Sequence, residues 1–119
     1  MRWLDWLPIG RVPEIAPEDL ARRLAEPDAP VVIDVRTAIE FHRGHIPGAQ
    51  HVPVQALAAS LPSLALASGA TVVAVCKTAH RSIPAVRLLR SEGLPALQLS
   101  GGMDRWRRHG LPLVQGDRP

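Results

Sequence analysis

The sequence has few of the residues that would indicate a disulfide-linked or membrane-spanning protein. Among 119 residues there is one cysteine, one phenylalanine and no tyrosine. A single cysteine excludes an intrachain disulfide and favours either a reducing compartment or a reactive thiol. No apolar run approaches the roughly 20 residues that a membrane-spanning helix needs. We therefore expect a soluble, cytoplasmic protein with no membrane span.

Lysine is almost absent as well, and the formal net charge of +3 comes from scattered arginines. The densest group is Arg105, Arg107 and Arg108. A nucleic-acid-binding surface usually combines a basic stripe with aromatic residues between the charges, and this chain has neither. We expect no nucleic-acid partner, and we interpret the positive charge as a solvated surface that attracts anions.

Strand and helix patterns alternate along the chain, separated by glycine and proline. Thr37 and Glu40 form a capping box, Gly44 ends the helix that follows, and Ser82 is predicted to be an N-cap. We predict strands at 31–35, 51–53, 71–75 and 95–99, and helices at 17–26, 38–43, 54–61, 83–92 and 103–109. Such alternation predicts an α/β fold whose parallel sheet is covered on both faces. The expected domain is 12–114, with an N-terminal arm at 1–11 and a tail at 115–119.

The cysteine, Cys76, directly follows the clearest predicted strand, 71–75. Ligands of parallel α/β sheets bind at the carboxyl ends of the strands. The loop after Cys76 leads into a helix N-terminus, where backbone N–H groups and the helix dipole attract anions and favour a thiolate. Lys77, His80 and Arg81 add positive charge. The alternative is a small buried core residue, but the basic loop argues against it.

Charged residues near the expected site have less specific roles. Asp34 ends a predicted strand, so we expect it to hydrogen-bond the loop backbone or polarise the site. Arg36 is predicted to pair with Glu40. Two roles remain open for Arg81, which either orients the substrate or closes the loop.

A metal or cofactor site is not expected. His42 and His45 are three residues apart, but Gly44 interrupts the helix between them and nothing completes a ligand set. We interpret His45 as structural and Trp106 as a core anchor of the last helix.

Three blocks of residues make the chain recognisable. Together, in this order and at this spacing, they resemble the rhodanese family from about Val12 to Val114. The blocks are Asp34-Val35-Arg36 with Glu40-Phe41 and Gly44-His45-Ile46-Pro47-Gly48-Ala49; Cys76-Lys77-Thr78-Ala79-His80-Arg81-Ser82; and Gly101-Gly102-Met103-Asp104-Arg105-Trp106 with Gly110-Leu111-Pro112.

The resemblance implies a five-stranded parallel sheet flanked by helices, and a sulfurtransferase activity that needs no cofactor. A catalytic Cys76 would take sulfane sulfur from a donor such as thiosulfate and hold it as a persulfide. It would pass the outer sulfur to cyanide, to a thiol, or to a protein partner. The cradle for that sulfur would be formed by Lys77, Thr78, Ala79, His80, Arg81 and Ser82. Many family members have glycine where this chain has Ala79, and a positive φ there would cost alanine about 1 kcal/mol.

Two other functions share parts of this pattern. Dual-specificity cysteine phosphatases and arsenate reductases would require five residues between cysteine and arginine, whereas Cys76 and Arg81 are separated by four. They also commonly place histidine before the cysteine, where this chain has Val75. Non-enzymatic binding modules of the rhodanese type usually lack the cysteine. Sulfur transfer is therefore the favoured function, and a protein-to-protein persulfide carrier remains its variant.

The arm at the N-terminus carries an apolar cluster of Trp3, Leu4, Trp6 and Leu7. Such clusters rarely stay solvated, so we expect the arm to pack on the domain or in a dimer contact.

Overall fold

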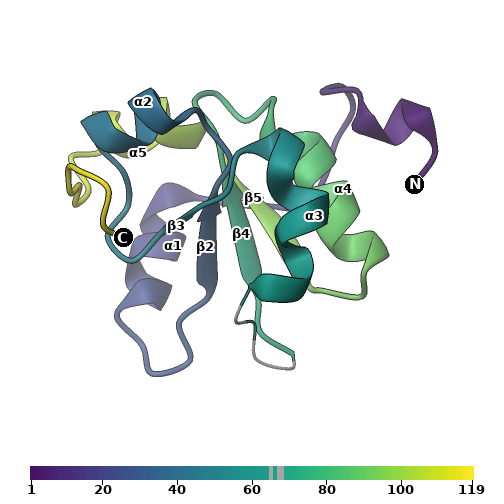
Figure 1. Cartoon of the computed structure of the whole chain (residues 1–119). Helices are drawn as coiled ribbons and strands as arrows, with labels where there is room; N and C mark the ends of the chain where they lie inside the picture. The colour runs from purple at the N-terminus through teal and green to yellow at the C-terminus, as the bar shows by residue number, and fades with distance from the viewer. Residues whose placement is uncertain (65, 67–68) are drawn as a thin grey trace.

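Five parallel strands form one sheet in the order β1-β5-β4-β2-β3. The computed structural model describes residues 1–64, 66 and 69–119 (Figure 1). The strands are β1 (Glu14–Ile15), β2 (Val31–Asp34), β3 (Gln50–His51), β4 (Val72–Val75) and β5 (Ala96–Leu99). The α-helices are α1 (Pro17–Leu24), α2 (Ala38–Arg43), α3 (Leu57–Ser60), α4 (Ser82–Ser91) and α5 (Gly102–Arg108). Short 3-10 helices are η1 (Trp3–Trp6), η2 (Val54–Ala56) and η3 (Leu61–Ser63).

The sheet has helices on both faces, which confirms the predicted α/β class. Strand β4 lies at its centre and is wholly buried. Val72 and Ala74 face an apolar cluster that includes residues of α3 and α4. Val73 and Val75 face the opposite cluster, which includes residues of α1, α2 and α5. Figure 1 shows these three helices on the other side of the sheet from α3 and α4. Buried on both faces, β4 reads in the sequence as an unbroken apolar run.

The predicted elements agree with the structure best where apolar runs are longest. The strands predicted at 31–35, 71–75 and 95–99 are confirmed to within one residue. Strand β1 was not predicted, because two residues at the sheet edge are too few to show an alternating pattern. The strand predicted at 51–53 lies instead at Gln50–His51. The helix predicted over 54–61 divides into η2, α3 and η3, and Pro62 lies in the first turn of η3, where it supplies no backbone N–H.

Helix α2 begins and ends where the sequence predicts. Thr37 and Glu40 cap it reciprocally, and Gly44 is its C-cap. His45, just beyond it, is fully buried, and its ring nitrogens lie 2.7 Å from the Phe41 carbonyl oxygen and 2.6 Å from that of Arg118. Its structural role is confirmed. Trp106 is also buried, and its Nε1 donates to the Pro112 carbonyl at 2.9 Å.

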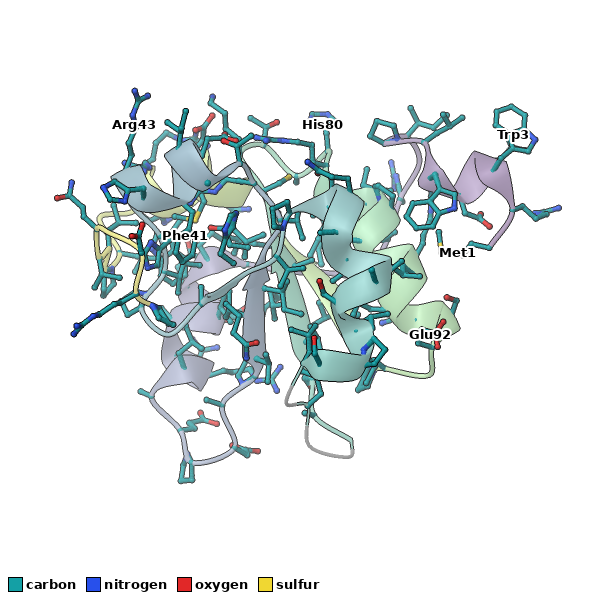
Figure 2. All side chains as sticks on the ribbon, in the orientation of Figure 1. Met1, Trp3, Phe41, Arg43, His80 and Glu92 are labelled. Atoms are coloured by element: carbon teal, nitrogen blue, oxygen red, sulfur yellow. The ribbon has the colours of Figure 1, made fainter. Side chains whose placement is uncertain are left out.

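The N-terminal arm lies against α4, at the opposite side of the molecule from α2 (Figure 1). Arg87 of α4 holds it, donating to the carbonyl oxygens of Leu7 at 3.1 Å and Ile9 at 2.6 Å. The arm thus packs on the domain through its backbone. Its tryptophans stay exposed, and Trp3, at 74% exposure, projects outward (Figure 2). Within the part of the chain that the structure describes, no helix is long and apolar enough to cross a membrane.

Candidate active site

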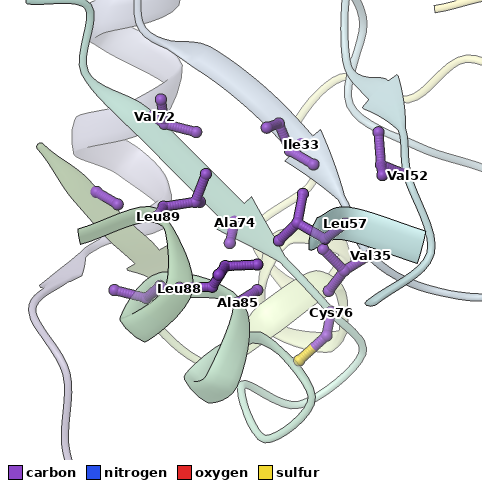
Figure 3. Packing of buried hydrophobic residues seen from close by; sticks show 12 residues of the cluster. Ile33, Val35, Val52, Leu57, Val72, Ala74, Cys76, Ala85, Leu88 and Leu89 are labelled. Carbon is purple, nitrogen blue, oxygen red and sulfur yellow. The ribbon is translucent and has the colours of Figure 1, made fainter. Parts of the chain in front are cut away.

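Cys76 lies at the carboxyl end of the central strand β4. Only 1% of the residue is exposed, and it belongs to the apolar cluster that also contains Val35, Leu57 and Ala85 (Figure 3). Its Sγ is 3.3 Å from the Ser82 Oγ, at the start of α4. The thiol therefore lies beneath the loop that joins β4 to α4, with apolar residues on its inner side.

The loop above the thiol offers unused backbone donors. Among the hydrogen bonds of the described residues, none uses the N–H groups of Lys77, Thr78, Ala79, His80 or Arg81. The loop reverses direction through Ala79, whose φ is +70°. Lys77, Thr78 and His80 are exposed, and Ala79 and Arg81 are half-buried, so their N–H groups can meet water or a ligand. The anion cradle expected at this loop stays a prediction, with which these N–H groups are compatible.

Helix α5 supports the loop from the other side. The backbone N–H of Met103 donates to the Cys76 carbonyl at 2.8 Å, and that of Asp104 donates to the Lys77 carbonyl at 3.0 Å. Gly102 has a φ of +60°, and a Cβ at this position would collide with both carbonyl oxygens. Its role was not predicted from the sequence, although a Gly-Gly pair before a helix is a signal of close backbone approach.

Arg81 closes the loop onto α2. Its guanidinium donates to both carboxylate oxygens of Glu40, at 2.7 and 2.8 Å. Of its two predicted roles, the loop-closing role is the one that the contacts show. The hydrogen bonds from Arg81 lower the pKa of Glu40 to about 2, although partial burial opposes this shift and Thr37 adds to it. Glu40, in turn, raises the pKa of Arg81.

The predicted pairing of Arg36 with Glu40 is wrong. Arg36 pairs with Asp34, its Nε and Nη2 lying 2.9 and 2.8 Å from the two carboxylate oxygens. Arg36 also donates to the Gly44 carbonyl at 2.8 Å. Asp34 is 1% exposed, and a buried carboxylate needs a paired charge more than the half-exposed Glu40 does. The predicted bond from Asp34 to the loop backbone is likewise absent among the described residues.

The predicted N-cap role of Ser82 is also wrong. The N-cap is Arg81, and Ser82 is the first residue of α4. Its hydroxyl lies next to the Cys76 Sγ and donates to the Gln98 Oε1 at 2.6 Å. Gln98 Nε2 donates in turn to the Glu14 Oε2 at 2.8 Å. Gln98 and Glu14 are not predicted from the sequence, although a polar residue within the otherwise apolar strand β5 is a signal that points to Gln98.

A cleft of about 710 Å³ lies between the loop after Cys76 and the N-terminal arm. Thr78 and His80 are exposed loop residues that line this cleft, and Lys77 is exposed on the same loop (Figure 2 labels His80). Lys77 pairs with Asp104 at 3.0 Å, and Thr78 Oγ1 lies 3.0 Å from His80 Nδ1. The lining residues of the cleft are Pro8, Ile9, Gly10, Arg11, Val12, Glu14, Thr78, Ala79, His80, Ile83, Gln98 and Gly101.

Known proteins share this fold and much of this sequence. The chain is 35% identical over 104 residues to a sulfurtransferase of Allochromatium vinosum, covering 87% of this chain and 95% of that protein. It is 38% identical over 102 residues to the uncharacterized protein slr1261 of Synechocystis sp., covering 85% of this chain but only 55% of that relative's length. A thiosulfate sulfurtransferase structure from Pseudomonas aeruginosa superposes with a TM-score of 0.80 at 32% identity, over 89% of this chain and 20% of that one.

The family itself is defined by a match over most of the chain. Residues 16–109 fit the family model of the Rhodanese-like domain. They contain four of the five strands, β2 to β5, together with Cys76 and its loop, and β1 lies directly before them. The chain therefore belongs to the rhodanese-like family.

Proposed function

We propose that this protein is a sulfurtransferase that carries sulfur as a persulfide on Cys76. The Cys76 thiolate attacks the outer sulfur of a thiosulfate-like donor, the donor's S–S bond breaks, and sulfite leaves with the electron pair. A cyanide or thiolate acceptor then attacks the outer persulfide sulfur and releases the Cys76 thiolate. Atoms and electrons balance without any cofactor.

The observation that carries this proposal is the position of Cys76 under a loop of unused N–H donors. Both the thiolate and the terminal persulfide sulfur are anions, and Cys76 is buried at the edge of an apolar cluster with the Ser82 hydroxyl beside its sulfur. Preorganised donors stabilise developing negative charge most strongly where water is excluded. The names of the Allochromatium and Pseudomonas relatives, a sulfurtransferase and a thiosulfate sulfurtransferase, support the same chemistry.

Loop length favours sulfur transfer over phosphate chemistry. Six residues from Cys76 through Arg81 make a small ring of donors. A persulfide presents one terminal sulfur to that ring. A phosphate or arsenate presents several oxygens, each of which needs a donor at hydrogen-bond distance. We therefore expect negligible hydrolysis of aryl phosphates.

Intact-protein mass spectrometry tests the proposal. Thiosulfate should add one sulfur atom to the protein, and cyanide should remove it as thiocyanate. Cys76→Ser is nearly isosteric and should abolish both steps while the circular dichroism spectrum stays unchanged. Thiocyanate formation by this variant at the parent rate, or phosphatase turnover above sulfur transfer in the parent protein, would reject the proposal.

The acceptor can be identified with the same assay. We expect a protein acting as persulfide carrier to give its sulfur to a thiol faster than to cyanide. Comparing single-turnover release of the labelled outer sulfur to cyanide and to a small dithiol distinguishes the two acceptors. Faster release to cyanide would argue against the carrier role.

A further inference from the structure

A chain of side-chain hydrogen bonds connects the buried thiol to the surface. Ser82 Oγ lies 3.3 Å from the Cys76 Sγ and donates to the Gln98 Oε1 at 2.6 Å. Gln98 Nε2 donates to the Glu14 Oε2 at 2.8 Å. Ser82 and Gln98 are buried, whereas Glu14 is exposed and borders the cleft beside the arm. The chain thus links β4, α4, β5 and β1.

Donor and acceptor roles along this chain follow from chemistry. The Glu14 carboxylate can only accept, so the amide nitrogen of Gln98 faces it and the amide oxygen faces Ser82. The serine hydroxyl has one hydrogen, and Gln98 takes it. Toward Cys76, the Ser82 oxygen therefore offers only lone pairs. This arrangement accepts a hydrogen bond from the S–H of a thiol and disfavours a thiolate.

Ser82 can add a hydrogen bond to the thiolate only if its hydroxyl turns toward the sulfur. Once it donates to the Cys76 sulfur, the Gln98 Oε1 loses its donor at a buried position, which is costly. Rotating the Gln98 amide would supply Ser82 with an N–H instead. It would also bring the amide oxygen against the Glu14 carboxylate. Glu14 therefore holds the amide in the orientation that keeps the hydroxyl away from the sulfur.

We infer that Gln98 and Glu14 are positioning residues that restrain ionisation of the Cys76 thiol through Ser82. The inference rests on the proposed role of Cys76 as the nucleophile, and it adds a restraint on that nucleophile's activation. While Gln98 accepts the Ser82 hydrogen, the Ser82 oxygen can only accept from the Cys76 S–H, and Ser82 stabilises a thiolate only after its hydroxyl turns toward the sulfur. The proton leaves to water.

Other charged groups lie on the loop and on the elements packed against it, and of these Arg81 interacts electrostatically with Cys76. Unlike Glu14, these groups form no side-chain hydrogen bond with Ser82 or Gln98 among the described residues. They are Asp34 at the end of β2, Arg36 after it, Glu40 of α2, Lys77, His80 and Arg81 of the loop, and Asp104 of α5. A test must therefore separate the hydrogen-bond chain from the general electrostatic field.

The pH dependence of alkylation provides that test, because Cys76 is the only cysteine. Rates with iodoacetamide are measured against pH for the parent protein, for Gln98→Met and for Glu14→Gln. Methionine keeps the size and changes no charge, but it frees the Ser82 hydroxyl to donate to the thiolate. We expect the midpoint to fall by about one pH unit for Gln98→Met, since a hydrogen bond to a charged group is of that magnitude. Glu14→Gln should lower the midpoint by less than Gln98→Met does. The new side-chain amide can donate as well as accept, so it permits the Gln98 amide to rotate but does not force it to.

The matched control places each substitution together with Ser82→Ala. Without the hydroxyl, Gln98→Met should leave the midpoint where Ser82→Ala alone puts it, and Ser82→Thr should restore the shift. An unchanged or higher midpoint in Gln98→Met overturns the inference, as do equal shifts with and without the hydroxyl. Alkylation needs no sulfur donor. Failure of thiosulfate to load Cys76 would therefore count against the proposed function alone. An absent midpoint shift would count against the restraint through Ser82 alone.

Discussion

Ala79 holds the one backbone conformation in the described chain that a non-glycine residue rarely adopts. Its φ of +70° lies in the left-handed region, which fits the glycine that many rhodanese-family members have at this position. The Cβ of an L-residue is strained there by about 1 kcal/mol or more. The loop keeps this conformation because its two ends are anchored, at Cys76 by α5 and at Arg81 by Glu40.

Ala79→Gly should therefore stabilise the protein, by about 0.5 kcal/mol after the larger unfolded-state entropy of glycine is subtracted. Urea unfolding measures the change. The matched control is Ala58→Gly, at an exposed position of α3, which should destabilise by about 1 kcal/mol. If both substitutions destabilise alike, the left-handed conformation of the loop is refuted.

At the scale of elements, the N-terminal arm depends on one side chain of α4. Arg87 donates to three carbonyl oxygens of the arm, those of Asp5, Leu7 and Ile9. The apolar side chains of the arm contribute less, because Trp3, Leu4, Trp6 and Ile9 are exposed by 42% or more. Because the arm forms one wall of the cleft beside the loop, its attachment also determines the shape of that cleft.

Arg87→Met should release the arm, because methionine keeps the aliphatic stem but supplies no donors. We expect limited proteolysis to cut within residues 1–11 at least several-fold faster, with a small loss in melting temperature. Arg22→Met is the control, since Arg22 is an exposed residue paired with Asp19 alone among the described contacts. Equal protease sensitivity in the two variants would show that the arm is held by other contacts.

At the scale of the whole molecule, one ion pair joins the loop and α4 to α2. The bidentate bond from Arg81 lowers the pKa of Glu40 from 4.5 to about 2. A carboxyl whose pKa is lower in the folded state stabilises the fold above its unfolded pKa. That contribution is lost as the pH falls from about 4.5 through about 2. Acid should therefore weaken the link between the loop and the far side of the sheet.

Glu40→Gln should lower the unfolding free energy at pH 7 by roughly 1 kcal/mol, less than the full pKa shift implies, because water screens a partly exposed pair. The gap between variant and parent should shrink from pH 4.5 downward and close near pH 2. Urea titrations at several pH values measure it. The exposed Glu26→Gln serves as control, and a gap that stays constant over this range would contradict the prediction.

Local pattern alone determined much of this protein. The apolar runs at Val31 and Val72 specified the buried parallel strands, because a strand covered on both faces has no polar side. The Thr37–Glu40 capping box specified where α2 begins. The position of Cys76 directly after β4, at the edge where ligands of such sheets bind, also follows from the sequence.

Tertiary structure decided which partner each polar side chain takes. Arg81 and Glu40 are 41 residues apart, and Gln98 and Glu14 are 84 apart, so no local spacing could pair them. Both Asp34 and Glu40 are close to Arg36 along the chain, and Arg36 pairs with Asp34 because that carboxylate is the buried one. The free energy of a charge or hydrogen bond depends on its desolvation, and desolvation exists only once distant elements have packed together.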